Sequence, residues 1–433
     1  MPTPLFDAVK EYTLQKNHRF HMPGHSGSAE ALLPFSHILP FDITEVDGLD
    51  ALYLSDGVIK EAEHMAAAFF GTEQTLISAG GCTLAIQTML GLLGQCKGKI
   101  LVARNCHRAV VHALGLLDFT AEYVYPDKND GGRINPADIK TALEADKNIR
   151  AVFITSPTYY GVLSNITAIA DVCRQAGIPL LVDNAHGTHL IFFNKHPISQ
   201  GASMTACSAH KTLPVLTGGA WLNIADKRFC ENSKNIMSVF GSTSPSYLIM
   251  SSLDLCRDWC EREGKKAFSE LKEKVSEIRE YAETYGFPGI KGETDPVRIT
   301  LDIEGTENLS DVLEHEKIIP EYYDSKYIVL LPTPFLKKED FTALQHMIRT
   351  LKRTGLKKQA AMIEKPRTVL SPREALFAEK EAMRAEVLLG RTAAEPVCLY
   401  PPGIPLVMPG EQISAGIRDT IINSGISFVK VVK

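Results

Sequence analysis

A lysine and an aspartate that follow two apolar runs could together bind an aldehyde cofactor. Asp183 ends the run 180–183 in LLVDNAHG, and Lys211 follows the run 204–208 in the stretch CSAHKTL. The carboxyl ends of strands in an open α/β sheet meet where ligands bind, so we expect the two side chains in one site. A lysine can join an aldehyde as a Schiff base, and a carboxylate can keep a pyridine nitrogen protonated. Taken alone, the two residues are explained equally well as an ion pair, or as an ordinary strand-end aspartate with Lys211 solvated.

Two further motifs could complete such a pocket. Gly80 and Gly81, in SAGGCTLAIQTML, form a turn directly before a helical stretch. Backbone N–H groups and the positive end of the helix would cradle a phosphate there, and Thr83 would add a hydroxyl. His107, in RNCHRAV, follows the run 100–103 and could lay its ring on a flat cofactor. Each motif alone is also explained as a connecting turn or a helix cap.

These residues need a sheet to position them. Helical stretches alternate with short apolar runs, which predicts an α/β fold with a mostly parallel seven-stranded sheet flanked by helices. The nearly continuous apolar content of the runs is typical of strands covered on both faces. The predicted strands are 75–78, 100–103, 122–125, 151–155, 180–183, 204–208 and 220–224.

We expect three parts along the chain. Residues 1–50 are rich in Pro, His and Gly, show no sustained period, and are predicted to form an N-terminal arm or cap. Residues 51–288 would form the large cofactor-binding domain, and 289–433 a C-terminal α+β domain. A charged helical stretch from 251 to 285, followed by Gly and Pro, marks the boundary between them. In the C-terminal part the pattern predicts strands at 297–303 and 327–331 and helices at 340–354 and 372–389.

The composition excludes several classes of protein. The 433 residues include 46 Lys and Arg against 51 Asp and Glu, which leaves no basic excess for nucleic acid or an anionic membrane. No apolar run approaches the roughly 18 residues that cross a bilayer, and the N-terminus does not resemble a signal peptide. The nine cysteines are odd in number and scattered, with no zinc-like spacing. We therefore expect a cytoplasmic protein without a metal site.

The chain resembles the Orn/Lys/Arg decarboxylase family, which depends on pyridoxal 5'-phosphate and has the aspartate-aminotransferase-like fold (fold type I). The Ser-x-His-Lys pattern and the blocks HMPGH and YPPGIP are specific, because generic transaminases share only the Asp and the Lys. The sequence departs from the family at Cys82, where Ser or Thr is expected. By the resemblance we expect the short form of the family, without an N-terminal flavodoxin-like domain. The supporting blocks are TPLFDAVKEY (3–12), HMPGH (21–25), DITEVDGLD (42–50), GGCT (80–83), NCHRAV (105–110), SPTYYG (156–161), VDNAHG (182–187), SAHK (208–211), STSPSY (242–247), YPPGIP (400–405) and PGE (409–411).

The resemblance implies how the cofactor would be held. Lys211 would join its aldehyde, Asp183 would bond its ring nitrogen, and His107 would stack on the ring. His186 would lie on the side of the phenolic oxygen or one layer behind it. The phosphate would be held by Ser208, Gly81, Cys82 and Thr83, with Thr243 reaching in from a neighbouring subunit.

The resemblance also implies a reaction. The expected enzyme is a carboxy-lyase that converts arginine, lysine or ornithine to the amine and CO₂ for polyamine biosynthesis, as a homodimer with shared active sites. His210 or Lys211 would return a proton to the α-carbon. Glu45 and Glu321 are the first candidates to accept the distal cationic group of the substrate. The alternatives are an aminotransferase or β-lyase on the same scaffold, or a catalytically silent paralogue that binds the cofactor.

Overall fold

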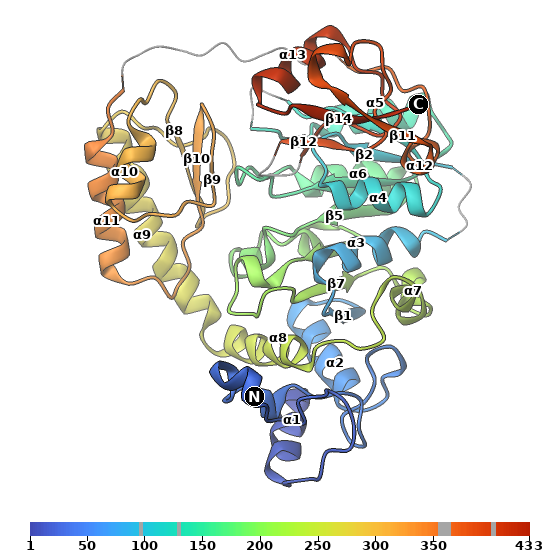
Figure 1. Ribbon diagram of the computed structural model, residues 1–433, viewed down its shortest axis with the longest axis vertical. Coiled ribbons are helices and arrows are strands. Elements are labelled where there is room, and N and C mark those ends of the chain that lie inside the picture. Colours follow the sequence, from blue (N-terminus) through green and yellow to red (C-terminus); the bar gives the residue numbers. More distant parts are fainter. Residues whose placement is uncertain (95–97, 128–130, 354–364, 400–403) are drawn as a thin grey trace. The chain divides into compact units, whose positions relative to one another are not determined.

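The computed structural model describes residues 1–94, 98–127, 131–353, 365–399 and 404–433 (Figure 1). Contacts divide the chain into two compact units. The first unit contains Met1–Gly94 and Pro179–Ala267, and the second contains Gln95–Ile178 and Phe268–Lys433.

A seven-stranded sheet with strand order β1-β7-β6-β5-β4-β2-β3 confirms the predicted fold class. Strand β7 is antiparallel to both β1 and β6, whereas the pairs β5–β6, β2–β4 and β2–β3 are parallel. Every predicted run is a strand. Six of them are mostly buried, which leaves a continuous apolar signal. The edge strand β3 instead alternates exposed and half-buried residues up to the buried Val124. The strands are β1 (Gln74–Ser78), β2 (Lys99–Ala103), β3 (Thr120–Val124), β4 (Ile149–Thr155), β5 (Leu180–Asp183), β6 (Met204–Cys207) and β7 (Ala220–Ile224).

In the first unit, helix α2 (Val58–Phe70) shows how the sequence pattern produces a packed helix. Ile59, Ala62, Ala66 and Phe70 recur at intervals of three and four residues and are buried. The helix ends at Gly71, whose φ of 67° suits a residue without a Cβ. The other helices of this unit are α1 (Pro4–Leu14), α3 (Gly81–Gly91), α7 (Ser233–Phe240) and α8 (Tyr247–Trp259).

Helix α1 was not predicted, because the group that caps it lies far along the chain. Thr3 makes no side-chain cap bond. Instead Asp254, on α8, accepts the N–H groups of Leu5 (3.0 Å) and Phe6 (3.2 Å) through Oδ2. Its other oxygen accepts a bond from Arg257 at 3.1 Å, and both side chains are almost fully buried. A cap supplied by a distant residue leaves no local signal in the first fifty residues.

Replacing Asp254 by alanine should lower the free energy of unfolding by about 3 kcal/mol, because it removes the cap and one partner of a buried guanidinium. Denaturant unfolding would measure the change. Asp171→Ala is the matched control, since Asp171 also pairs with an arginine three residues on, but at the surface. It should cost less than about 1 kcal/mol. Equal losses in the two variants would contradict this role of Asp254.

In the second unit, a three-stranded antiparallel sheet has the order β8-β10-β9.

The charged stretch predicted as one long helix is α8, a π-helical turn at Cys260–Gly264, and α9 (Lys265–Thr284). Most of α9 belongs to the second unit. The further elements are α4 (Arg108–Leu116), α5 (Pro136–Ala145), α6 (Ile166–Gln175), β8 (Ile299–Asp302), α10 (Leu309–His315), β9 (Tyr322–Tyr323), β10 (Tyr327–Leu330) and α11 (Lys338–Thr350).

The predicted helix 372–389 is wrong beyond its first six residues. Helix α12 (Pro372–Phe377) ends early, and β11 (Lys380–Arg384) pairs antiparallel with β14 (Phe428–Val432). The Ala, Glu and Lys content favours a helix, but pairing with a strand that buries Val429 and Val431 decides the outcome. The remaining elements of this part are β12 (Val397–Leu399), β13 (Ile404–Val407) and α13 (Ala415–Asn423). Residues 400–403 of the YPPGIP block lie outside the described residues.

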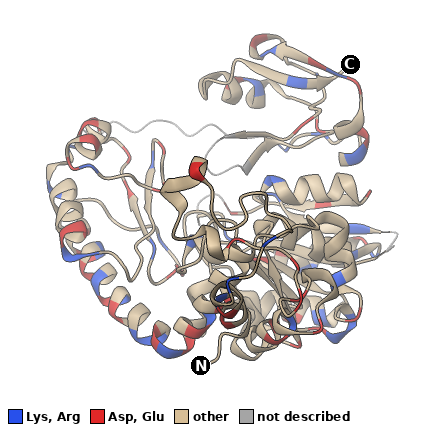
Figure 2. Ribbon diagram, turned by 60° about the horizontal axis from the view of Figure 1, so that its bottom comes forward, with Lys and Arg blue, Asp and Glu red and all other residues tan. Residues whose placement is uncertain are grey.

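Basic and acidic residues alternate along the elements visible in Figure 2, most clearly on the long charged helix. Among the described residues, no helix is long and apolar enough to cross a membrane.

Candidate active site

The structure brings Lys211 and Asp183 to one edge of the sheet, as the strand ends predict. Strands β5 and β6 are parallel, with Asp183 opposite Ala206, so both chains leave the sheet on the same side. A short 3₁₀ turn, Ala209–Lys211, then carries the lysine. Its Nζ lies 3.0 Å from Nε2 of His186, which follows β5. The lysine, the carboxylate and this imidazole therefore form one cluster within the first unit.

Asp183 is a buried carboxylate, and few neighbouring groups stabilise its negative charge. Only 2% of the residue is exposed, and Oδ1 accepts the N–H of Ala185 at 3.1 Å. Burial raises the pKa of Asp183, although the charge of Lys211 and the bond from Ala185 oppose the shift. The site therefore favours a ligand that brings a positive charge to this carboxylate.

The raised pKa predicts a stability effect in the cofactor-free protein. Between the usual value of 3.8 and the higher value in the fold, the native state holds more protons than the unfolded state. Stability contributed by this group therefore falls as pH rises through that window. Asp183→Asn should raise the free energy of unfolding at neutral pH, and the gain should vanish near pH 4. Denaturant unfolding at the two pH values measures it, with the exposed Asp171→Asn as control. A loss of stability at neutral pH would contradict the prediction.

Ser208 and His210 surround the lysine on its own turn. Ser208 is buried, and its Oγ lies 3.4 Å from Nδ1 of His210. The same nitrogen lies 3.2 Å from the carbonyl of Gly219 and 3.3 Å from the amide of Gly218. Burial, reinforced by the charge of Lys211, lowers the pKa of His210. The imidazole is therefore held in a fixed orientation and is neutral at neutral pH.

The glycine turn before α3 offers an open anion site. The helix begins at Gly81 and has no side-chain cap. Gly81 has a φ of 70°, and its N–H donates to the carbonyl of Gly218 at 2.9 Å. Thr83 is exposed and Cys82 is half-buried, so the first turn of the helix is accessible. These features suit a phosphate group.

Cys82 places this turn beside the charged pair. Burial and the charge of Asp183 raise the pKa of the Cys82 thiol well above its usual value, while Lys211 lowers it. The thiol is therefore protonated at neutral pH. It could donate a weak hydrogen bond at the position where a hydroxyl was expected.

A buried polar cluster around Cys207 was missed from the sequence. Three N–H donors converge on its Sγ: Asn184 Nδ2 at 3.3 Å, Asn223 Nδ2 at 3.4 Å and His196 Nε2 at 3.4 Å. Burial raises the pKa of Cys207 to about 11 and lowers that of His196 to about 3, so both are neutral. The cluster lies at the ends of β5 and β6, where Asn184 directly follows Asp183 and Cys207 directly precedes Ser208. No motif marks it, because its members come together only through the strand order.

The other predicted residues have the following surroundings. His107 belongs to the second unit, where it caps α4 by accepting the N–H of Ala109 at 3.2 Å. Glu321, also in the second unit, accepts a bond from the Tyr159 hydroxyl at 2.9 Å. In the first unit, Glu45 accepts one from the Thr44 hydroxyl at 2.6 Å. Thr243 is exposed in the loop between α7 and α8. Their roles stay predictions.

The carboxylate of Asp50, the last residue of the DITEVDGLD block, is engaged in the fold. Its carboxylate accepts the N–H groups of Ala51, Asp56, Gly57 and Ile59 and so caps the start of α2. Within the described part of the chain, no group of three or more His, Cys, Asp or Glu residues could hold a metal ion.

Two family models match the chain. The model of the Orn/Lys/Arg decarboxylase major domain matches residues 3–301, and that of the C-terminal domain of the same family matches residues 355–423. The first match alone covers more than half of the chain.

Individual proteins show the same similarity. An uncharacterized protein of Bacillus subtilis, YaaO, is 31% identical, with 96% of this chain and 92% of that protein covered. An arginine decarboxylase of Bacillus anthracis is 30% identical, with 95% and 91% covered. The crystal structure of the Francisella novicida lysine decarboxylase LdcF aligns with all of this chain and 81% of its own, at a TM-score of 0.84 and 19% identity, and therefore shows the shared fold.

Proposed function

Because the chain belongs to the Orn/Lys/Arg decarboxylase family and is thereby an amino-acid decarboxylase, we propose that it uses pyridoxal 5'-phosphate and acts on a basic amino acid. The observation that carries the proposal is the cluster in which Lys211 Nζ lies 3.0 Å from His186, with the buried Asp183 beside it. The relatives of about 30% identity that are named arginine decarboxylase favour arginine as the first substrate to test, ahead of lysine and ornithine.

The described residues fit this cofactor. A lysine amine stands at the end of β6, and the carboxylate at the end of β5 is short of positive charge. The uncapped first turn of α3 and the buried hydroxyl of Ser208 suit the phosphate. We propose that Lys211 holds the aldehyde, Asp183 the ring nitrogen, and Gly81, Cys82, Thr83 and Ser208 the phosphate. His186 would contact the cofactor on the side of its phenolic oxygen.

When bound, the cofactor would supply a conjugated system that accepts the electron pair left on the α-carbon as CO₂ departs. The negative charge of Asp183 would keep the ring nitrogen protonated, which strengthens that acceptor. His210 is held in one orientation by the 218–219 turn and would position a proton near the α-carbon, with Lys211 as the alternative donor. His107 would pack against the ring.

Substrate recognition needs acceptors for a distal ammonium or guanidinium group. Glu45 and Glu321 are the proposed acceptors, and each carboxylate already accepts one neutral hydroxyl in the structure. A cation that replaces or joins this hydroxyl would gain a charge-assisted hydrogen bond.

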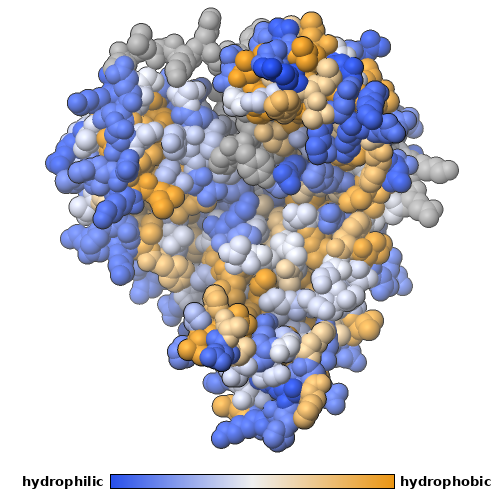
Figure 3. All heavy atoms as spheres, in the orientation of Figure 1, coloured by the Kyte–Doolittle hydropathy of each residue, from blue (hydrophilic) through white to orange (hydrophobic). Residues whose placement is uncertain are grey.

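We also propose a cytoplasmic homodimer with shared sites and a role in polyamine biosynthesis. The N-terminal segment exposes large apolar side chains, including Phe20 at 99% and Leu33 at 66%, and Figure 3 shows such hydrophobic surface among hydrophilic residues. A partner that covers these side chains would remove apolar area from water. The proposed parts are the arm 1–50, the cofactor domain 51–288 and the C-terminal domain 289–433.

The test is to incubate the cofactor-loaded enzyme with arginine, lysine and ornithine separately and to measure CO₂ and the amine formed. We expect equimolar CO₂ and amine from one of the three. Keto-acid formation without CO₂ would indicate an aminotransferase, and cofactor binding without any product would indicate a silent paralogue.

A further inference from the structure

The buried thiol of Cys207 connects the two segments that carry most of the proposed cofactor residues. The first segment, 183–186, begins at the last residue of β5, and the second, 208–211, directly follows β6. Asn184 belongs to the first segment, and Cys207 directly precedes the second. The hydrogen bond from Asn184 Nδ2 to Cys207 Sγ, at 3.3 Å, therefore joins the starts of the two segments inside the protein.

Asn184 fixes the course of the first segment through its backbone and its side chain. Its N–H donates to the carbonyl of Ala206 on β6, and its carbonyl accepts the N–H of Gly187, both at 2.9 Å. The side chain adds the bond to Cys207. Oδ1 of Asn184 is buried and accepts no hydrogen bond from the described residues. Within this part of the chain, the sulfur is thus the partner that orients the Asn184 amide.

The sulfur is itself tied to two further strands. Nδ2 of Asn223, on β7, lies 3.4 Å from Sγ of Cys207 and 3.3 Å from the hydroxyl oxygen of Thr205. Oδ1 of Asn223 accepts the hydroxyl of Thr75, on β1, at 2.8 Å. Thr75, Thr205 and Asn223 are fully buried, so water does not compete for these bonds. The strands β1, β6 and β7 therefore fix the sulfur, and the sulfur fixes Asn184.

We propose that Cys207 is a positioning residue: its sulfur holds Asn184 and thereby fixes Asp183 relative to Lys211. The inference rests on the proposed function, because these two side chains are the proposed cofactor ligands. A misplacement of about 1 Å in such a site can cost about 10²-fold in rate. Because burial raises the pKa of Cys207 to about 11, the thiol accepts these donors without placing a second negative charge near Asp183.

Two substitutions of Cys207 test the proposal in the protein loaded with pyridoxal 5'-phosphate. Cys207→Ala removes the acceptor and should lower kcat at least about tenfold, with KM changed less than about twofold, because no substrate contact is removed. The pH midpoint of the visible absorbance without substrate should shift by at least about 0.5 unit, since it depends on the distance from Lys211 to the charge of Asp183. Cys207→Ser keeps an acceptor and should recover most of both changes.

The variant Asn184→Ala tests whether the effect passes through Asn184. It should reproduce the loss of kcat and the shifted midpoint, and the double variant should match Cys207→Ala, because both substitutions break the same contact. Fully additive changes would overturn the proposal. If Cys207→Ala does not fold, Asn184→Ala carries the same prediction.

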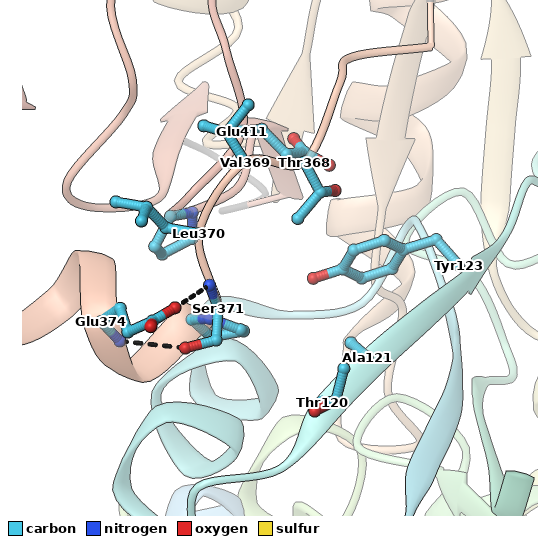
Figure 4. A pocket seen from close by; sticks show the side chains of 11 residues that line it. Thr120, Ala121, Tyr123, Thr368, Val369, Leu370, Ser371, Glu374 and Glu411 are labelled. Carbon is cyan, nitrogen blue, oxygen red and sulfur yellow. Dashed lines mark hydrogen bonds between the residues drawn. The ribbon is translucent and has the colours of Figure 1, made fainter. Parts of the chain in front are cut away.

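Two controls separate positioning from the loss of a thiol or of stability. Cys173→Ala removes another buried thiol, from α6 in the second unit. Ser371→Ala destabilises α12 by removing the hydroxyl that accepts the N–H of Glu374 at 3.2 Å. Figure 4 shows both hydrogen bonds of this cap beside a cavity of the second unit. Both controls should keep the kcat and the midpoint of the wild type.

The outcomes distinguish this inference from the proposed function. A loaded, active wild type together with unchanged kcat and midpoint in Cys207→Ala would overturn the positioning role alone. A wild type that binds no cofactor would overturn the proposed function, and the positioning role with it.

Discussion

Lys211→Ala should abolish decarboxylation and covalent attachment of the cofactor together. Lys211 belongs to the described Lys–His–Asp cluster at the ends of β5 and β6, and its amine is the proposed bond to the cofactor aldehyde. Loss of the nucleophile should lower kcat by at least about 10³-fold, because no other group supplies its covalent step. Product analysis measures the activity, and the visible absorbance of the loaded protein measures attachment.

Lys227→Ala is the control for this loss. Lys227 is 80% exposed and forms a long surface ion pair with Glu73, so its removal should change neither readout. Retained turnover in Lys211→Ala would refute the assignment, whereas loss of both signals in Lys227→Ala would point to a general folding defect.

Asp183→Asn should lower kcat by about 10²–10³-fold while leaving the cofactor attached to Lys211. The variant keeps the shape of the side chain and the bond from Ala185, but it removes the negative charge that would hold the ring nitrogen protonated. Losing one preorganised electrostatic group of this kind costs an amount of this order. The readouts are the steady-state rate and the pH dependence of the visible absorbance, which a merely structural role would not shift.

The exposed Asp171→Asn is again the control and should behave as the wild type. The expected gain in stability of the cofactor-free Asp183→Asn protein would show that burying this carboxylate costs stability. The expected loss of kcat in the same variant would show that the carboxylate serves activity. Wild-type kcat in Asp183→Asn would contradict the proposed role.

The sheet and the central cluster could be predicted from the sequence because each depends on local patterns. Buried strands leave continuous apolar runs, and residues at the ends of parallel strands meet at one edge. These two rules predicted that Asp183 and Lys211 lie at one edge of the sheet, whereas their expected roles came from the resemblance to the family. The glycine turn at Gly81 was equally visible, since a positive φ before a helix is a local property.

The missed features depend on contacts between distant parts of the chain. Helix α1 is capped by Asp254, about 250 residues away. Strand β11 overrides its helical composition by pairing with β14. The donors on Cys207 come from three different segments that only the strand order brings together. No window of sequence contains these partners.

The central claim is that the amine of Lys211 carries the cofactor. Borohydride reduction of the loaded enzyme, followed by proteolysis and mass spectrometry, would locate the added mass. We predict a single modified peptide that contains Lys211. The same mass on a different lysine, or its absence from every peptide of a protein that binds the cofactor, would contradict the account.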